Sequence, residues 1–165
     1  MPLRTDVAAA EDAPAIAALR RAAAEHLTER FGAGHWSLTA SDRSVLAALK
    51  TSRLLVVRDG GQIVATLRLA TKKPWAIDRR YFVQVERPLY LTDMAVSPAR
   101  QRQGIGRALL AAATDVARAW PSQAIRLDAY DADAGAGPFY EKCGFHEVGR
   151  VVYRETPLIY FERLL

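Results

Sequence analysis

The chain lacks the sequence features of disulfide-bonded, membrane-spanning and secreted proteins. Cys143 is the only cysteine, which excludes an internal disulfide and a zinc site built from several cysteines. No apolar run approaches the ~18 residues that a membrane-spanning helix needs, Ala108–Ala113 being among the longest. The first residues include Arg4, Asp6 and Glu11, which are too charged for the apolar part of a signal peptide. We therefore expect a soluble, cytoplasmic protein in a reducing compartment, with no membrane partner.

The rest of the composition is that of an ordinary globular protein. Half of the 165 residues are apolar and 25% are charged, with 10 glycines and 8 prolines. This balance excludes a collagen-like, disordered or low-complexity chain. Because domains usually contain ~100–200 residues, we predict a single domain over residues 1–165.

Acidic residues are missing where basic ones gather. The net charge is +5, and between Ser97 and Ala113 there are three arginines, Arg100, Arg102 and Arg107, with no acid. A nucleic-acid-binding protein would show a longer basic stripe interleaved with aromatic residues. A local patch instead favours a small phosphorylated ligand, although an ordinary solvated surface would also explain the charge.

Periodicity and turn residues predict a mixed α/β fold. The predicted helices are Ala13–Arg30, a shorter one from Ser41 or Asp42 to Leu49, Gly106–Ala119 and a turn at Pro138–Lys142. The predicted strands are Leu3–Ala8, Leu54–Arg58, Gln62–Leu69, Pro88–Ser97, Ala124–Asp128, Phe145–Arg154 and Leu158–Arg163, with a bend at Pro157. Asp59-Gly60-Gly61 predicts a hairpin turn between the second and third of these strands, and Tyr81–Val85 is expected to extend that hairpin. Most strands are expected to be antiparallel, but strand 88–97, its helix and strand 124–128 should form a parallel, right-handed unit.

The turn at the centre of that unit has the composition of an anion-binding site. Residues 101–107 read Gln-Arg-Gln-Gly-Ile-Gly-Arg, and Gly104 and Gly106 let the backbone turn sharply and approach a ligand. The helix that follows presents unpaired N–H groups and the positive end of its dipole, and Arg102 and Arg107 add donors suited to phosphate. A tight strand-to-helix turn without a ligand is the alternative.

Two other phosphate-binding motifs fit less well. A dinucleotide fingerprint would have Gly or Ala where this chain has Leu109, although Asp128 lies about where its ribose-binding acid would be, so it stays the runner-up. A P-loop is excluded because no Gly-Lys-Ser or Gly-Lys-Thr follows the glycines.

Two motifs resemble the GNAT superfamily of N-acetyltransferases. Residues 91–98, Leu-Thr-Asp-Met-Ala-Val-Ser-Pro, followed by Gln101-x-x-Gly104-x-Gly106, resemble its acetyl-coenzyme A motif, and residues 138–145, Pro-Phe-Tyr-Glu-Lys-Cys-Gly-Phe, resemble a second family segment. The resemblance is specific over residues 89–146 and looser over the rest. It implies a mostly antiparallel central sheet, with one parallel strand pair splayed at the cofactor site and about four flanking helices.

The resemblance also implies site residues for acetyl-coenzyme A. The backbone of Met94, Ala95 and Val96 would bind the pantetheine arm and direct an N–H group at the thioester carbonyl. Backbone amides of the glycine turn would hold the pyrophosphate; the residues of this turn are Gln101, Arg102, Gln103, Gly104, Ile105, Gly106 and Arg107. Tyr140 matches a tyrosine that lies near the sulfur and acts as the general acid.

The chemistry of amide formation supports a tyrosine acid and calls for a base. A leaving thiolate has a pKa near ~8.5, and a tyrosine near ~10 can share or supply its proton. An alkylammonium of pKa ~10 must lose a proton before it attacks. We favour Asp128 as the base, with Glu86, Asp93 or no dedicated base as alternatives. Strand alternation places Asp93 on the face opposite Thr92 and Met94, unless a bulge intervenes, so we expect Asp93 to pair locally as a structural acid.

Several other residues affect the prediction less. Asp133 stands where the family resemblance would place an Asn. Gly135, Gly137 and Pro138 make a poor helix start, which predicts a short helix around Tyr140. The chain has three histidines, His26, His35 and His146, which are too scattered for a local metal motif, so we expect no metal site. Trp36 and Trp75 lie in loops that the family analogy places near the acceptor.

The sequence thus predicts an N-acetyltransferase that moves an acetyl group from acetyl-coenzyme A to a primary amine by direct attack. A catalytically silent coenzyme A-binding module is the alternative, and a nucleic-acid binder the third. The sequence does not identify the acceptor, which is a small-molecule or peptide amine. It also leaves the oligomeric state open, with a homodimer as one possibility.

Overall fold

A computed structural model describes residues 2–165, which divide into two compact units. Unit 1 comprises the chain up to Leu69 together with Asp93–Ala113, and unit 2 comprises Ala70–Thr92 and Thr114–Leu165. Strand β4 (Pro88–Val96) and helix α3 (Ile105–Ala119) each contribute residues to both units. That the whole chain is a single domain stays a prediction.

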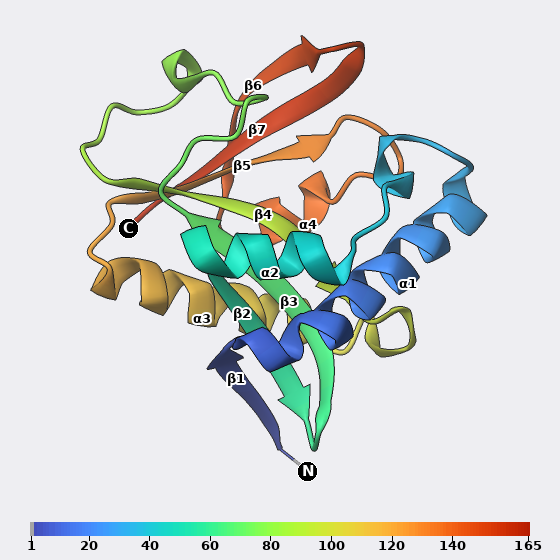
Figure 1. Cartoon of the computed structure of the whole chain (residues 1–165). Helices are drawn as coiled ribbons and strands as arrows, with labels where there is room; N and C mark the ends of the chain where they lie inside the picture. The colour runs from blue at the N-terminus through green and yellow to red at the C-terminus, as the bar shows by residue number, and fades with distance from the viewer. Residues whose placement is uncertain (1) are drawn as a thin grey trace. The chain divides into compact units, whose positions relative to one another are not determined.

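Unit 1 packs two helices against antiparallel strands (Figure 1). Its elements are β1 (Leu3–Val7), α1 (Ala13–Phe31), α2 (Asp42–Thr51), β2 (Arg53–Asp59) and β3 (Gln62–Ala70). Ser41 begins α2 by accepting a hydrogen bond from the Ser44 N–H. The predicted Asp59-Gly60-Gly61 turn joins β2 to β3, with Asp59 paired to Gln62. The core between helices and strands includes Ile16, Val45 and Val56.

Unit 2 contains an antiparallel three-strand arrangement with a short helix. Its complete elements are β5 (Ala124–Tyr130), α4 (Gly137–Lys142), β6 (His146–Tyr153) and β7 (Thr156–Leu164), with β7 between β5 and β6. The long segment between β3 and β4, residues 71–87, packs its apolar side chains Ile77 and Phe82 against Tyr90 and Tyr160. We call this segment the 71–87 loop.

The strand order confirms the predicted fold class. The seven strands pair in the order β1-β2-β3-β4-β5-β7-β6, and β4 and β5 pair in parallel. Their register extends from Pro88↔Ala124 to Tyr90↔Arg126 and ends there, although both strands continue. This divergence, called the splay below, is the feature that the family resemblance implies beside the cofactor. Within residues 2–165, no helix has the length and apolar character to cross a membrane.

Two local predictions were wrong. Residues 81–85 do not extend the hairpin, because the 71–87 loop forms a 3-10 turn at Arg79–Tyr81 and side chains from other strands bind the backbone of Val83. The last hairpin turns at Arg154 and Glu155, with φ of 46° and 69°, and not at Pro157, which lies inside β7 opposite Val152. Pattern reasoning missed this turn because left-handed positions usually favour Gly, Asn or Asp.

Candidate active site

The second half of β4, in unit 1, is bent at Asp93. Asp93 has a φ of 57°, a left-handed value that interrupts the alternation of the strand as a bulge does. Its carboxylate lies 3.0 Å from Arg20 Nη2 and 3.9 Å from Arg68 Nη1. Asp93 therefore pairs locally, as one of the two interpretations of the sequence had it, and these cations occupy the carboxylate that a base would need free.

The glycine turn that follows β4 is exposed and tied down at its edges. The Gln101 side chain donates to the Val96 carbonyl at 3.4 Å, and Arg100 bonds Asp59 at 2.5 Å and Gln103 at 3.0 Å. Arg100 therefore anchors the turn to the β2–β3 hairpin and is engaged within the protein, unlike an arginine reserved for a ligand. The backbone between these anchors is held in place without covering its outer surface.

The conformation of this turn suits a bound diphosphate. Arg102 and Gly104 are left-handed, with φ of 62° and 79°, and no atom lies within 4 Å of where a Gly104 side chain would begin. The N–H of Ala108 bonds the Gly104 carbonyl at 3.0 Å, so the N–H groups of Gly104, Ile105 and Gly106 come before this bond at the positive end of α3. An open concave backbone at a helix start is the arrangement that phosphates require.

In unit 2, the splay places a hydroxyl and a carboxylate on one face. Tyr90 and Arg126 are register partners whose side chains meet at 3.2 Å, and two residues further along Thr92 and Asp128 point to the same side. Thr92 Oγ1 is buried and has no hydrogen-bond partner among residues 2–165. Asp128 makes no ion pair within residues 2–165, and burial raises its pKa above the usual value.

Helix α4 holds the predicted acid, Tyr140, in an aromatic cluster. The Tyr140 ring lies 5.4 to 6.1 Å, centroid to centroid, from Phe139, Phe145 and Phe161, and the residue is 7% exposed. Burial first, then the charges of Asp128 and Cys143, raises the pKa of Tyr140, so its phenol keeps its proton at neutral pH. The effect of the Asp128 charge shows that unit 2 brings these two predicted residues close together.

The remaining acids lie in less suitable places. Glu86 is exposed and precedes the paired end of β4, while the splay begins after Tyr90. Asp133 is exposed in the turn between β5 and α4. The short helix predicted from Gly135, Gly137 and Pro138 is the six-residue α4, and a side chain at Gly135 would begin 1.9 Å from the Tyr130 carbonyl oxygen.

Sequence reasoning missed two features of unit 2. The first is the buried, unpartnered hydroxyl of Thr92, whose place beside Asp128 depends on the register of the parallel pair. The second is a buried ion pair between Arg126 and Glu162, at 3.0 Å with both side chains 3% exposed. The alternation of Arg126 with apolar residues in a buried strand was the available signal for it. No group of three or more potential metal ligands occurs within residues 2–165.

Comparison with known proteins identifies the family. No curated protein sequence matches the chain. Among solved structures it is similar to a PaiA N-acetyltransferase from Thermoplasma acidophilum in complex with coenzyme A, at a TM-score of 0.77 and 13% identity, covering 100% of both chains. It is also similar to the ribosomal-protein-S18-alanine N-acetyltransferase of Escherichia coli, at a TM-score of 0.72 and 18% identity, covering 99% of this chain and 94% of that one.

A third similar structure, YncA from Salmonella typhimurium, was solved with acetyl-coenzyme A; it has a TM-score of 0.72 and 20% identity, over 99% of this chain and 94% of that one. At these identities the likeness shows a common fold. The sequence model of the acetyltransferase (GNAT) family matches residues 16–145, which include both motifs of the candidate site. The chain therefore belongs to the GNAT family of acetyltransferases.

Proposed function

We propose that this protein transfers an acetyl group from acetyl-coenzyme A to a primary amine by direct attack of the amine. The observation that supports the proposal most strongly is the splay, where β4 and β5 separate beside a half-buried Asp128 that forms no ion pair within residues 2–165. Family membership and two similar structures solved with coenzyme A or acetyl-coenzyme A support the choice of cofactor.

Unit 1 supplies the residues that would hold the cofactor. Backbone N–H groups of the turn from Gln101 to Arg107, with the start of α3, suit the pyrophosphate, and the backbone of Met94, Ala95 and Val96 suits the pantetheine arm. When bound, acetyl-coenzyme A supplies an acetyl thioester whose leaving group is a thiolate. An N–H group from residues 94–96 would stabilise the negative charge that develops on the carbonyl oxygen.

Unit 2 supplies the groups that would move protons. Asp128, with its raised pKa, accepts a proton from the attacking amine, either directly or through a water. The nitrogen–carbon bond forms, the carbon–sulfur bond breaks, and the electron pair leaves on sulfur. Tyr140 donates a hydrogen bond to the departing sulfur and shares its proton there. Its raised pKa keeps the phenol protonated but makes it a weaker acid than the thiol, so the hydrogen bond stabilises the thiolate as it leaves.

The test is thiol release from acetyl-coenzyme A in the presence of a panel of primary amines. We expect release that depends on the amine, and a drop in kcat of about 10²-fold or more in Tyr140→Phe. Tyr90→Phe is the matched control, because it also removes a buried tyrosine hydroxyl, one that bonds Arg126 and not a reacting atom. Equal losses in both variants would contradict the role of Tyr140.

Calorimetry with coenzyme A distinguishes an active acetyltransferase from a catalytically silent coenzyme A-binding module. Heat of binding together with thiol release supports the enzyme. Binding without thiol release for any amine would instead show a silent coenzyme A-binding module, and no binding at all would refute both.

A further inference from the structure

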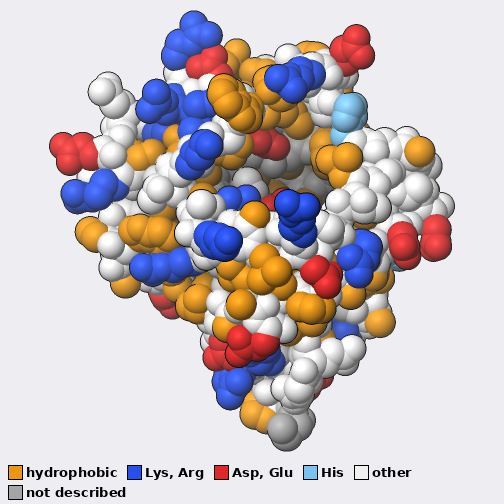
Figure 2. Space-filling model, viewed as in Figure 1, with side chains coloured by type: hydrophobic (Ala, Val, Ile, Leu, Met, Phe, Trp, Pro, Cys, Tyr) orange, Lys and Arg blue, Asp and Glu red, His pale blue; other side chains and the backbone are white. Residues whose placement is uncertain are grey.

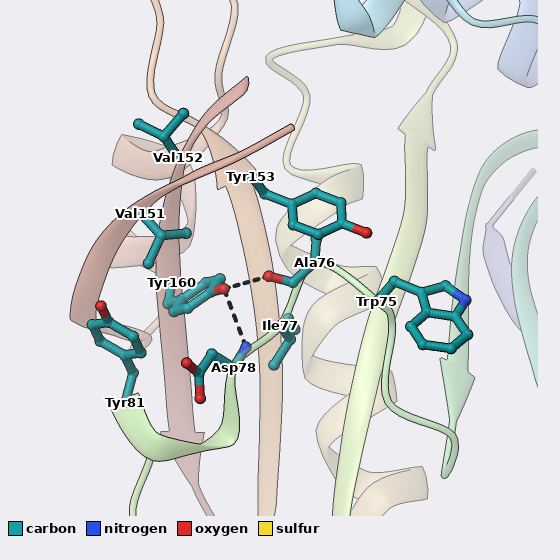
Figure 3. Close-up of a pocket in the computed structure, with 9 residues that line it drawn as sticks. All are labelled: Trp75, Ala76, Ile77, Asp78, Tyr81, Val151, Val152, Tyr153 and Tyr160. Carbon is teal, nitrogen blue, oxygen red and sulfur yellow. Dashed lines mark hydrogen bonds between the residues drawn. The ribbon is translucent and has the colours of Figure 1, made fainter. Parts of the chain in front are cut away.

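Unit 2 contains a pocket that the mechanism above does not use. It lies between the 71–87 loop and the β6–β7 hairpin and has a volume of about 420 Å³ (Figure 3). Four aromatic residues, Trp75, Tyr81, Tyr153 and Tyr160, line it together with Asp78. This volume lies within the range of small-molecule sites, and the pocket is open to solvent with aromatic and polar groups in its lining.

The loop that forms one wall of this pocket is fixed in place. The Tyr160 hydroxyl donates to the Ala76 carbonyl and accepts a hydrogen bond of 3.1 Å from the Asp78 N–H, as Figure 3 shows. Further along the loop, the buried Arg126–Glu162 pair binds both backbone groups of Val83: Glu162 accepts from its N–H at 3.1 Å and Arg126 donates to its carbonyl. A wall held at two points makes the pocket preformed, which lowers the entropic cost of binding.

The lining favours an aromatic guest. Trp75 is 83% exposed and Tyr81 is 42% exposed, so large ring surfaces at the pocket remain in contact with water. Tyr81 and Tyr160 already meet edge to face, with centroids 5.4 Å apart. A planar ring from a ligand can extend this arrangement and cover the exposed surface of Trp75, gaining apolar burial and ring contacts together.

The pocket adjoins the candidate base. Tyr160 is the register partner of Asp128 across the β5–β7 pair, so the two side chains lie on the same face. Burial, and then the charges of Asp128 and Asp78, raises the pKa of Tyr160, against the lowering effect of its hydrogen bond from the Asp78 backbone. The Asp78 carboxylate is already paired with Arg80 at 2.7 Å, so Asp128 is the carboxylate that would attract a cationic group at the Tyr160 end of the pocket. Thr92, beside Asp128 at the splay, has a buried hydroxyl with no partner.

We infer that the acceptor is a primary amine that carries an aromatic ring, with the ring held by Trp75, Tyr81 and Tyr153 and the amine directed past Tyr160 toward Asp128. This inference rests on the proposed function, because it assigns the acceptor of that same reaction. Aliphatic polyamines and simple alkylamines have no ring to fill the pocket and are expected to be poor acceptors.

The experiment compares 2-phenylethylamine with propylamine in the thiol-release assay. We expect kcat/KM to favour 2-phenylethylamine by about tenfold or more. Trp75→Ala should remove most of this preference by raising the KM for 2-phenylethylamine, with no change in the KM for acetyl-coenzyme A. Leu164→Ala is the control, since Leu164 is a half-exposed apolar residue on β7, four residues beyond Tyr160. Binding of 2-phenylethylamine without cofactor is measured by the change in tryptophan emission. That change should be absent in Trp75→Phe.

The outcomes separate this inference from the proposed function. Thiol release with equal kcat/KM for the two amines, or a preference that Trp75→Ala leaves intact, refutes the aromatic pocket and leaves the acetyltransferase standing. A Trp75-dependent emission change without thiol release from any amine supports the pocket and refutes the transferase. The absence of both the preference and the emission change overturns the inference.

Discussion

The environment of Asp128 supports its proposed role as a base. A carboxylate that stabilises a fold is usually paired, as Asp12 is with Arg58 at 2.8 Å, and the hydrogen bond from Arg58 lowers the pKa of Asp12 although burial raises it. Among the residues that the structure describes, Asp128 has no such cation, and burial raises its pKa. The ionised Asp128 carboxylate therefore destabilises the folded state at neutral pH, and such perturbed carboxylates are common at functional sites.

Replacing Asp128 with Asn should increase stability and reduce activity. A folded-state pKa above the unfolded value favours folding at low pH, and that contribution is lost as the pH rises through the raised pKa. Asp128→Asn should therefore unfold at higher urea concentration than the wild type at pH 7, and the difference should disappear at acidic pH, where the wild-type carboxyl is protonated. Its kcat/KM should fall by about 10²-fold. A variant that is less stable at pH 7 would contradict this account of Asp128.

The wild-type rate should report the same group. Because only ionised Asp128 accepts a proton, kcat/KM should fall as the pH is lowered through its raised pKa, above the range of an exposed aspartate. The acid limb of the pH profile should be absent in Asp128→Asn. An acid limb that persists in this variant would assign the titration to another group.

Thr92 offers a second residue whose removal should separate stability from function. Its buried hydroxyl has no partner in the described part of the chain, so Thr92→Val removes a desolvated polar group and keeps the shape of the side chain. We expect the free energy of unfolding to rise by about 1 kcal/mol, while the KM for the amine increases. Thr66→Val is the control, because the Thr66 hydroxyl bonds the Leu55 carbonyl at 3.1 Å and its loss should destabilise the fold.

At the scale of elements, most of the fold was predictable and the contacts between distant segments were not. The β2–β3 hairpin, β4, α3 and the short α4 follow from turn residues and periodicity within a few residues of each boundary. The glycine turn and Tyr140 could be predicted as site residues because each belongs to a motif that is continuous in the sequence. The Thr92–Asp128 juxtaposition depends on the register between β4 and β5, which no local pattern encodes.

The 71–87 loop shows the same limit. Its sequence predicted an extension of the hairpin at Tyr81–Val85, and this was wrong because local pattern cannot show that Arg126 and Glu162 bind the backbone of Val83 from 43 and 79 residues away. Tyr160 was likewise predicted only as part of a strand, and its hydrogen bonds to residues 76 and 78 make the loop a pocket wall. Side chains far along the chain thus determine the element that would select the acceptor.

The Arg126–Glu162 pair should control this loop. Glu162→Ala leaves the buried Arg126 guanidinium without its partner, so we expect a loss of about 3–5 kcal/mol in the free energy of unfolding, measured by urea denaturation. The double variant Arg126→Met with Glu162→Leu removes both charges and should recover much of that loss. If the pair positions the loop, the double variant should still show a raised KM for 2-phenylethylamine and an unchanged KM for acetyl-coenzyme A. An unchanged KM for both would make the pair purely structural.

For the molecule as a whole, charge is a weak guide to the ligand. The net charge of +5 comes from 23 basic and 18 acidic residues, and several arginines are engaged internally, including Arg58 with Asp6 and Asp12. Figure 2 shows Lys and Arg side chains interspersed with hydrophobic and acidic ones on the face viewed. Local geometry at the glycine turn, and not overall charge, indicates where a diphosphate would bind.

Binding at that turn should stabilise the entire chain measurably. A ligand that binds only the folded state at 100 times its Kd adds about 2.7 kcal/mol, which corresponds to a rise in Tm of roughly 5–10 °C for a protein of this size. Gly104→Asp should abolish most of this rise with coenzyme A, because it places a negative charge beside the phosphates. Gly60→Asp is a closely matched control: Gly60 also has a positive φ, 63° against 79°, and open space where a side chain would begin, but it lies in the β2–β3 turn. Both variants should lower the Tm of the free protein by a similar amount, since both force an L residue into a left-handed conformation. Only Gly104→Asp should lose the response to coenzyme A. A Tm rise in Gly104→Asp equal to that in Gly60→Asp would show that the cofactor does not use this turn.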